Sequence, residues 1–153
     1  MRTTTATLFA LTLTLTLASA MPLLAVSPAQ EKAFVEAYRK AFEAKDTKTL
    51  ESFLYTKGND PTVLEFYKTM QSGEAGSNIA SIELVALTAA ELKKALEPQD
   101  GPSGRLALPL KPTKKLVIKV ATKDANGSSS SSSEILIADA DGKLVVPVPG
   151  PVK

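Results

Sequence analysis

Hydrophobic side chains recur every three or four positions through the first part of the chain, which is the period of an amphipathic helix. Phe34, Tyr38 and Phe42 form the clearest stripe of this kind. The segment 27–30, Ser-Pro-Ala-Gln, precedes the stripe and has the residues of a capping box, with proline at the first helical position. We therefore expect a helix that begins at Pro28.

Two aspartates mark the starts of two further helices, because aspartate is a preferred N-cap residue. Asp46 precedes a short hydrophobic segment that contains Leu50, and Asp60 is followed directly by Pro61. The sequence predicts a short helix after Asp46 and a longer one from Pro61 to about Gln71.

From residue 79 onward the hydrophobic period changes to two, which is the period of a half-buried strand. The pattern predicts strands over residues 79–87, 114–123, 128–137 and 144–146. Thr88, followed three residues later by glutamate, forms a second capping box and predicts a short helix after the first strand. Residues 149–153 are rich in proline and are expected to form a frayed tail.

Helices that precede an antiparallel sheet indicate an α+β fold. We expect three N-terminal helices packed on a curved antiparallel sheet of four or so strands, with one short helix after the first strand. A single domain over residues 28–148 accommodates these elements. The aromatic residues after position 20 all precede residue 68, so the helices are expected to supply the large core side chains: Phe34, Tyr38, Phe42, Phe53, Tyr55, Phe66 and Tyr67.

The N-terminus has the order of a secretory signal peptide. Arg2 precedes an uncharged hydrophobic run, residues 8–17, and Ala-Ser-Ala follows at residues 18–20. We expect cleavage after Ala20, with cleavage after Ala25 as the alternative, and residues 21–27 as a spacer before the domain. This pattern predicts an exported protein, periplasmic or extracellular.

A retained membrane anchor is the second interpretation of the N-terminus. Residues 8–26 contain no charge, and a run of this length is just sufficient to cross a bilayer. The threonines within the run and Pro22 oppose this interpretation, so cleavage is favoured. Membrane contact is expected only through an uncleaved signal segment.

The composition excludes several kinds of chemistry. The chain has no histidine and no cysteine, so Ser-His-Asp and Cys-His catalysis, disulfides and thiolate metal sites are all excluded. The chain has 18 basic and 16 acidic side chains, and this near balance indicates no partner by itself. We expect no metal and no cofactor.

The helical part resembles the nuclear transport factor two-like, or cystatin-like, α+β superfamily. The resemblance lies in residues 34–38, Phe-Val-Glu-Ala-Tyr, and residues 41–46, Ala-Phe-Glu-Ala-Lys-Asp. It implies a conical fold over roughly residues 28–148, with a pocket between the first helix and the sheet. Members include isomerases, dehydratases and small-ligand binders. The enzymes typically place Asp and His in the pocket, and this chain has no histidine.

Four residues are candidates for a pocket lining. Tyr38 and Tyr67 lie on hydrophobic helix faces and could offer hydroxyls to a ligand, although tyrosines in such positions are more often core residues. Glu83 is the carboxylate inside the first predicted strand, and burial there would raise its pKa and make it a general base. Lys119 lies central in its strand. Ordinary surface positions are the alternative for Glu83 and Lys119.

Residues 105–123 contain six basic residues and no acidic one, which is the clearest charge asymmetry of the chain. An anionic envelope polymer or lipid head groups could bind such a surface. The alternative is lysine placed on strands to prevent aggregation. The candidate surface comprises Arg105, Lys111, Lys114, Lys115, Lys119 and Lys123.

Together these patterns favour an exported, non-catalytic module that binds a small apolar molecule or a protein. This hypothesis predicts a largely apolar cavity between the stripe of Phe34, Tyr38 and Phe42 and the sheet. An envelope-component-binding protein and a His-free enzyme that uses carboxylate and tyrosine groups are the alternatives. Nucleic acid is not expected as a partner, because no aromatic residue follows Tyr67 to stack on a base.

Overall fold

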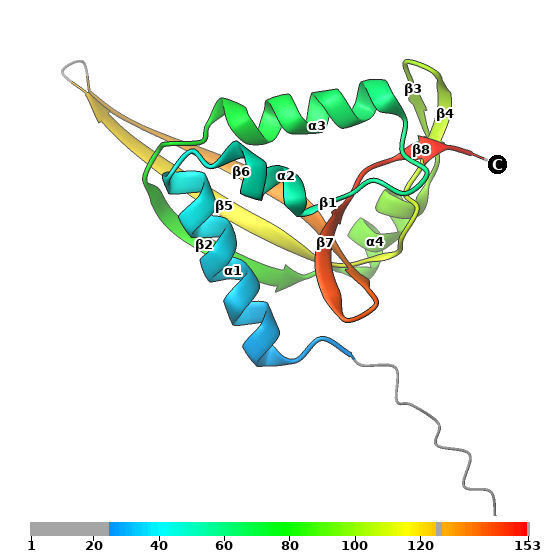
Figure 1. The fold of residues 1–153 in the computed structure, drawn as a ribbon, viewed down its shortest axis with the longest axis horizontal. Coiled ribbons are helices and arrows are strands. Elements are labelled where there is room, and N and C mark those ends of the chain that lie inside the picture. Colours follow the sequence, from blue (N-terminus) through cyan, green and yellow to red (C-terminus); the bar gives the residue numbers. More distant parts are fainter. Residues whose placement is uncertain (1–24, 125–126, 153) are drawn as a thin grey trace, which may run out of the picture.

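The computed structural model describes residues 25–124 and 127–152 and has an α+β fold (Figure 1). The predicted signal peptide, residues 1–20, and its cleavage site after Ala20 lie outside the described residues. The elements follow in the order α1 (Pro28–Glu43), α2 (Thr47–Ser52), β1 (Leu54–Tyr55), α3 (Pro61–Gly73), β2 (Ile79–Ala86), α4 (Ala89–Leu96), β3 (Gln99–Gly101), β4 (Gly104–Ala107), β5 (Pro112–Asp124), β6 (Gly127–Ala140), β7 (Lys143–Pro147) and β8 (Gly150–Pro151).

The predicted architecture, three successive helices on one antiparallel sheet of four or so strands, is wrong. Strand β1 lies between α2 and α3, and the described strands form two sheets. The larger sheet has the order β1-β7-β6-β5-β2 and is mixed, because β1 and β7 are parallel; the smaller has the order β3-β4-β8. Strands of two or three residues, such as β1, β3 and β8, are too short to produce a recognisable alternation of hydrophobic residues.

The helix starts follow from local side-chain chemistry. Ser27 and Gln30 form the expected capping box at the start of α1, and Thr88 and Glu91 form the same box at α4. Asp60 caps α3 by accepting hydrogen bonds from the amides of Thr62 and Val63. Each cap satisfies backbone N–H groups that a helix leaves unpaired at its start. The first residue of these helices was therefore readable from the sequence.

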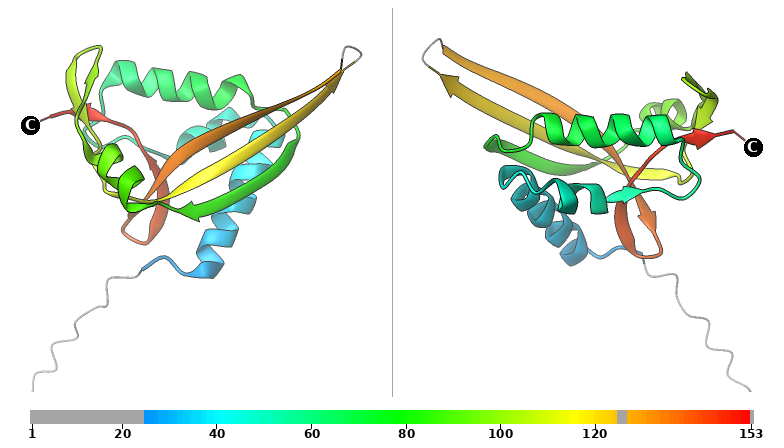
Figure 2. Two further views of the ribbon diagram at one scale, coloured as in Figure 1. Left: turned by 180° about the vertical axis from the view of Figure 1, so that it is seen from behind. Right: turned by 45° about the horizontal axis from the view of Figure 1, so that its top comes forward.

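The large sheet is built around the long hairpin of β5 and β6. The two strands pair antiparallel from Pro112 opposite Ala138 to Asp124 opposite Gly127. β2 pairs with the other edge of β5 along its length, whereas β7 pairs only with residues 138–140 of β6. Figures 1 and 2 show the far end of this hairpin extending beyond the helices. Within the described residues, β6 therefore has no strand partner on its second edge before residue 138.

Helix α1 lies against one face of this sheet, which we call the inner face. Leu116, Ile118 and Val120 of β5 point to this face and are buried, as are Tyr38 and Phe42 of α1. Complete burial of one such side chain contributes about 1.5–3 kcal/mol relative to its exposure. This contact between one helix stripe and alternate residues of β5 forms the centre of the hydrophobic core.

The end of α1 also fixes the start of β2 by hydrogen bonds. The Arg39 guanidinium donates to the carbonyl oxygen of Ile79 at 3.0 Å, and the Glu43 carboxylate accepts from the amide of Ile79 at 3.1 Å. Arg39 and Glu43 form an ion pair with each other at 3.4 Å. Both polar backbone groups of Ile79 are thus satisfied by the helix, and the edge strand is held in one register.

The C-terminal segment is part of the structure, in contrast to the frayed tail expected for residues 149–153. Gly150–Pro151 forms β8 and pairs with β4, and the amide of Val152 donates to the carbonyl oxygen of Arg105 at 3.0 Å. Proline has no N–H to donate, but it is compatible with a short edge strand in which neighbouring residues supply the hydrogen bonds. A proline-rich ending therefore does not by itself predict fraying.

Gly150 packs so tightly that a side chain cannot be accommodated. A Cβ atom built at this position would lie 1.7 Å from the carbonyl oxygen of Gly58, which belongs to the backbone and cannot rotate away. We predict that Gly150→Ala lowers the free energy of unfolding by about 1–3 kcal/mol, measured by chemical denaturation. Gly73→Ala is the matched control, because a Cβ there meets nothing within 4 Å. The control should be neutral or stabilising, and equal effects of the two substitutions would contradict this packing.

Candidate functional site

Two cavities lie beside helix α3. The first, which we call the inner pocket, has a volume of about 200 Å³ and lies where α1, α3, β5 and β6 meet. The second, which we call the α4 pocket, also has a volume of about 200 Å³ and lies among α3, α4, β4 and β6. The residues that line the inner pocket are Tyr38, Phe42, Met70, Gln71, Glu74, Ile118, Ser133, Glu134 and Ile135.

The inner pocket occupies the position predicted for a cavity beside the α1 stripe. Tyr38 and Phe42 line it from α1, and Ile118 and Ile135 line it from β5 and β6. All four side chains are buried. The walls are therefore mainly apolar, as in most small-molecule sites.

A buried polar pair interrupts these apolar walls. The Gln71 amide nitrogen donates to the Tyr38 hydroxyl at 3.5 Å, which is a long hydrogen bond. Gln71 is only 4% exposed, and its carbonyl oxygen has no hydrogen-bond partner among the described residues. A buried polar group without a partner costs about 1–3 kcal/mol of stability. The protein thus retains an unfavourable group in the wall of a cavity.

Burial keeps the Tyr38 hydroxyl protonated. Removal from solvent raises the pKa of Tyr38 to about 12, and the hydrogen bond from Gln71 opposes this rise only in part. In the described part of the chain, no hydrogen bond uses the hydroxyl proton of Tyr38. Both groups are enclosed by the packing around them, since the Tyr38 side chain is 0% exposed and the Gln71 carbonyl oxygen is buried.

The sequence pattern predicts Tyr38 as a pocket residue, whereas Gln71 was not among the expected residues. Gln71 lies on the buried face of α3, eight residues after Val63 and four residues after Tyr67. These spacings place all three residues on one side of a helix. A glutamine in a hydrophobic stripe is the signal that could have been noticed, because an uncharged polar residue there requires a partner or a function.

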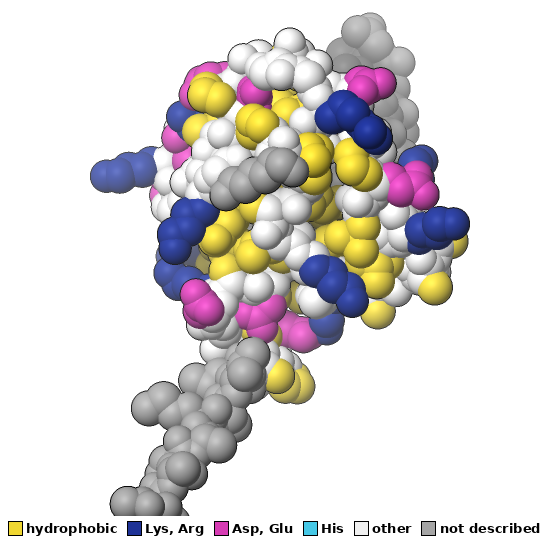
Figure 3. All heavy atoms as spheres, turned by 90° about the vertical axis from the view of Figure 1, so that its right-hand side faces the viewer, with side chains coloured by type: hydrophobic (Ala, Val, Ile, Leu, Met, Phe, Trp, Pro, Cys, Tyr) yellow, Lys and Arg dark blue, Asp and Glu magenta, His cyan; other side chains and the backbone are white. Residues whose placement is uncertain are grey.

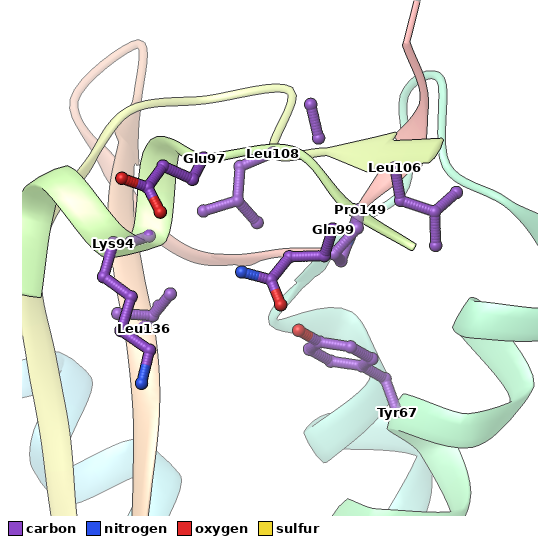
Figure 4. Close-up of a pocket in the computed structure, with 10 residues that line it drawn as sticks. Tyr67, Lys94, Glu97, Gln99, Leu106, Leu108, Leu136 and Pro149 are labelled. Atoms are coloured by element: carbon purple, nitrogen blue, oxygen red, sulfur yellow. The ribbon is translucent and has the colours of Figure 1, made fainter. Parts of the chain in front are cut away.

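The α4 pocket is shown in Figure 4. The Tyr67 ring points into it from α3, with its hydroxyl toward Gln99, and Leu106, Leu108 and Pro149 form its far wall. Burial raises the pKa of Tyr67 as well. Lys94 and Gln99, together with Leu136, also line a neighbouring hollow of about 470 Å³ over the sheet. This is a shallow surface depression, since Lys94 and Gln99 are both exposed.

The structure does not bring the four candidate pocket residues together. Tyr38 lines the inner pocket and Tyr67 lines the α4 pocket. Glu83 and Lys119 lie on the opposite, outer face of the sheet, where both are exposed. Glu83 pairs across the sheet with Val117, and Lys119 with Ser81 and Ser132. Neither position provides the burial that a general base or a Schiff-base lysine requires.

The basic run does not form one surface, because neighbouring residues of a strand point to opposite faces. The Lys114 ammonium forms an ion pair with Glu31 of α1 at 2.6 Å. The Lys115 ammonium contacts Glu91 at 2.7 Å and Glu134 at 3.0 Å, on the α4 side of the sheet. Two of the central lysines are thus neutralised by acidic partners.

The other members of the basic run lie apart from these two lysines. Arg105 is exposed in β4 of the small sheet, and Lys111 is exposed before β5. The side chain of Lys123 lies outside the described part of the chain. On the face shown in Figure 3, Lys and Arg side chains are dispersed among hydrophobic and acidic ones. No continuous basic surface is formed by the described members of the run.

No helix within residues 25–124 and 127–152 is long and apolar enough to cross a membrane. In the same residues, no group of three or more acidic side chains is arranged to hold a metal ion.

Comparison of the chain with protein-family models, with curated proteins and with solved structures finds no match. The resemblance to the nuclear transport factor two-like superfamily stays a prediction, and the site is interpreted from its own geometry.

The ion pair of Lys115 with Glu91 predicts a dependence of stability on pH. Hydrogen bonds from Lys115 and from Thr88 lower the pKa of Glu91 from 4.5 to about 2. A carboxyl group whose pKa is lowered by folding contributes stability above its unfolded pKa and loses that contribution as the pH falls through the folded value. The free energy of unfolding should therefore decrease between about pH 5 and pH 2.

Glu91→Gln tests this dependence, because glutamine keeps the capping oxygen of α4 but removes the charge. We predict that this variant shows a smaller decrease of stability between pH 5 and pH 2, measured by urea denaturation. Glu83→Gln is the control, since Glu83 is exposed and forms no ion pair with described residues. If the free energy of unfolding of Glu91→Gln decreased between pH 5 and pH 2 as steeply as that of the unmodified protein, the attribution of this pH dependence to Glu91 would be refuted.

Proposed function

We propose that this chain is an exported, non-catalytic module that binds a small, largely apolar molecule in the inner pocket. The observation that carries the proposal is the pocket of about 200 Å³, which opens to the surface beside Met70, Glu74 and Glu134 and is closed on its inner side by the core. Around it, Tyr38, Leu116 and Ile137 are each 0% exposed. Small-molecule sites are usually concave pockets of this kind, with mainly apolar walls that are already formed in the free protein.

The size of the cavity supports a small ligand. An apolar cavity of about 150 Å³ in another protein stays dry and binds benzene. The inner pocket is somewhat larger and includes four buried hydrophobic or aromatic side chains, Tyr38, Phe42, Ile118 and Ile135, in its walls. It therefore suits a ligand with about one ring or a branched chain of similar size.

The lining of the pocket supports the non-catalytic part of the proposal, because its two carboxylates, those of Glu74 and Glu134, are exposed to solvent. The buried polar residues of the pocket are Tyr38, with a pKa of about 12, and Gln71, which does not titrate. Glu83, the general base of the enzyme alternative, is exposed on the other face of the sheet. General acid–base catalysis near neutral pH requires a group whose pKa is close to that pH.

Export is part of the proposal and is supported by the order of the N-terminal segment: Arg2, the uncharged run 8–17, and Ala-Ser-Ala at 18–20. The mass of the exported protein tests it, since cleavage after Ala20 leaves a chain that begins at Met21. Recovery of the full 153-residue chain from the cell interior would oppose export.

Ser133 provides a direct test of binding in the inner pocket. Its small side chain lines the cavity near the unpaired edge of β6. We predict that Ser133→Trp fills the cavity and weakens the binding of toluene by at least about tenfold, measured by ligand-observed NMR. A loss of this size follows if the indole occupies the volume that the probe requires.

Ser132→Trp is the matched control for this experiment. Ser132 is the preceding residue of β6, is exposed, and pairs with Lys119 on the outer face. The control should bind toluene as the unmodified protein does. Absence of toluene binding to the unmodified protein, or equal loss in both variants, would refute a ligand site in the inner pocket.

A further inference from the structure

Strand β6 has one long edge without a strand partner. β7 pairs with β6 only at residues 138–140, so within the described residues the backbone groups on this edge have no partner strand before residue 138. Helix α3 lies beside Ser133 and Glu134. Nearer the hairpin end, residues 128–132 are all serine and all exposed. Figures 1 and 2 show this part of the hairpin projecting beyond the helices, where another strand has room to approach.

The projecting part of the hairpin also lacks a neighbouring strand on its other side. β2 pairs with β5 only as far as Val120, so residues 121–124 of β5 and 127–130 of β6 form a ribbon of two strands. Val120 is also the last buried side chain of β5 among those described. An isolated two-stranded ribbon is at best marginally stable in water, and a third strand or a packed face is usually needed. A strand added to the β6 edge would supply that support.

The sequence of the β6 edge lacks the features that usually prevent strand pairing. Natural edge strands are commonly protected by lysine, by proline or by a bulge. Residues 127–133 contain no proline and no charged residue, and no bulge interrupts their pairing with β5. The sequence of β5 beyond Val120, by contrast, includes Lys123 and Asp124. The edge of β6 is therefore the one that is open to strand addition.

A second copy of this chain fits this edge. Two antiparallel β6 strands can pair about a two-fold axis, so that each satisfies the free backbone groups of the other. With the axis at Ser130, Ser128 of one copy lies opposite Ser132 of the other, and no like charges are opposed. The contact closes after two copies, because it uses the same edge of each.

We infer that two copies associate by antiparallel pairing of residues 128–132 of β6, which joins their large sheets into one. This self-association is independent of the inner pocket and goes beyond the proposed binding function. Two short strands bury much less than the roughly 1,200 Å² of a stable, specific interface, so the association is weak and reversible.

A single cysteine at the centre of the pairing tests the inference, because the chain has no cysteine of its own. In Ser130→Cys the two thiols lie on directly opposite residues, whose Cβ atoms are about 4.5–5.5 Å apart. We predict that mild oxidation with diamide converts most of this variant to a disulfide-linked dimer, measured by electrophoresis without reductant.

Ala121→Cys is the matched control for the crosslinking. Ala121 pairs with Ser130 on the neighbouring strand and is also exposed. In the inferred dimer the two control thiols lie two strand spacings, about 10 Å, farther apart than those of Ser130→Cys. The control should therefore crosslink much more slowly, and equal crosslinking of the two variants would overturn the inference.

Sedimentation equilibrium measures the association without a crosslink. The average mass of the unmodified protein should rise as the concentration increases to about 1 mM. Ser130→Lys should weaken the association by at least about threefold, because two like charges then face each other at the axis. Ala121→Lys, with the same charge one strand away, should have a smaller effect. An unmodified protein that stays monomeric up to this concentration would also overturn the inference.

Discussion

The rest of the structure depends on the two-residue period of strand β5. Leu116, Ile118 and Val120 point to one face, where α1 covers them, while Lys115 and Lys119 point to the other. A shift of the register by one residue would place lysines in the core and leave aliphatic side chains in water. The hydrophobic contact of this one face with Tyr38 and Phe42 therefore selects the register of the sheet and the position of α1.

The same alternation explains why a basic sequence does not produce a basic surface. Lys114 and Lys115 are neighbours in the chain, but they form ion pairs on opposite faces, with Glu31 of α1 and with Glu91 of α4. A count of the charged residues along one strand therefore adds together side chains that lie on opposite faces of the sheet. The separation weakens the case for a polyanion partner.

The inner pocket arises where the sheet lacks a strand. Strand β7 pairs with β6 only at residues 138–140. Helix α3 lies beside the preceding part of β6, whose edge on this side has no strand partner among the described residues. The helix and the strand edge present surfaces of different shape, and the inner pocket lies between them. Small Ser133 on β6 leaves the resulting space open, and Gln71 on α3 makes it polar at one point.

Local signals were sufficient for the helix starts and for the long strands, because caps and hydrophobic periods act over a few residues. Ser27, Asp60 and Thr88 each cap a helix as their neighbours in the sequence indicate. The pairing of β1 with β7 and of β8 with β4 depends on residues far apart in the chain, so it could not be read from local pattern.

The candidate site residues also fall into two groups, those that the local sequence pattern predicts and those that depend on distant parts of the chain. Tyr38 follows from the helical stripe, whereas the role of Gln71 depends on the cavity that distant elements enclose. Glu83 and Lys119 were chosen for their positions in strands, and the face to which each strand residue points was decided by the packing of α1 and by the register of β5.

The central claim is that the inner pocket binds a small, largely apolar molecule. Thermal denaturation with and without toluene tests this claim most directly, because a ligand that binds only the folded state raises the midpoint of unfolding. Saturating toluene should raise the midpoint of the unmodified protein and should leave that of Ser133→Trp unchanged. An equal midpoint with and without toluene in the unmodified protein would contradict the account.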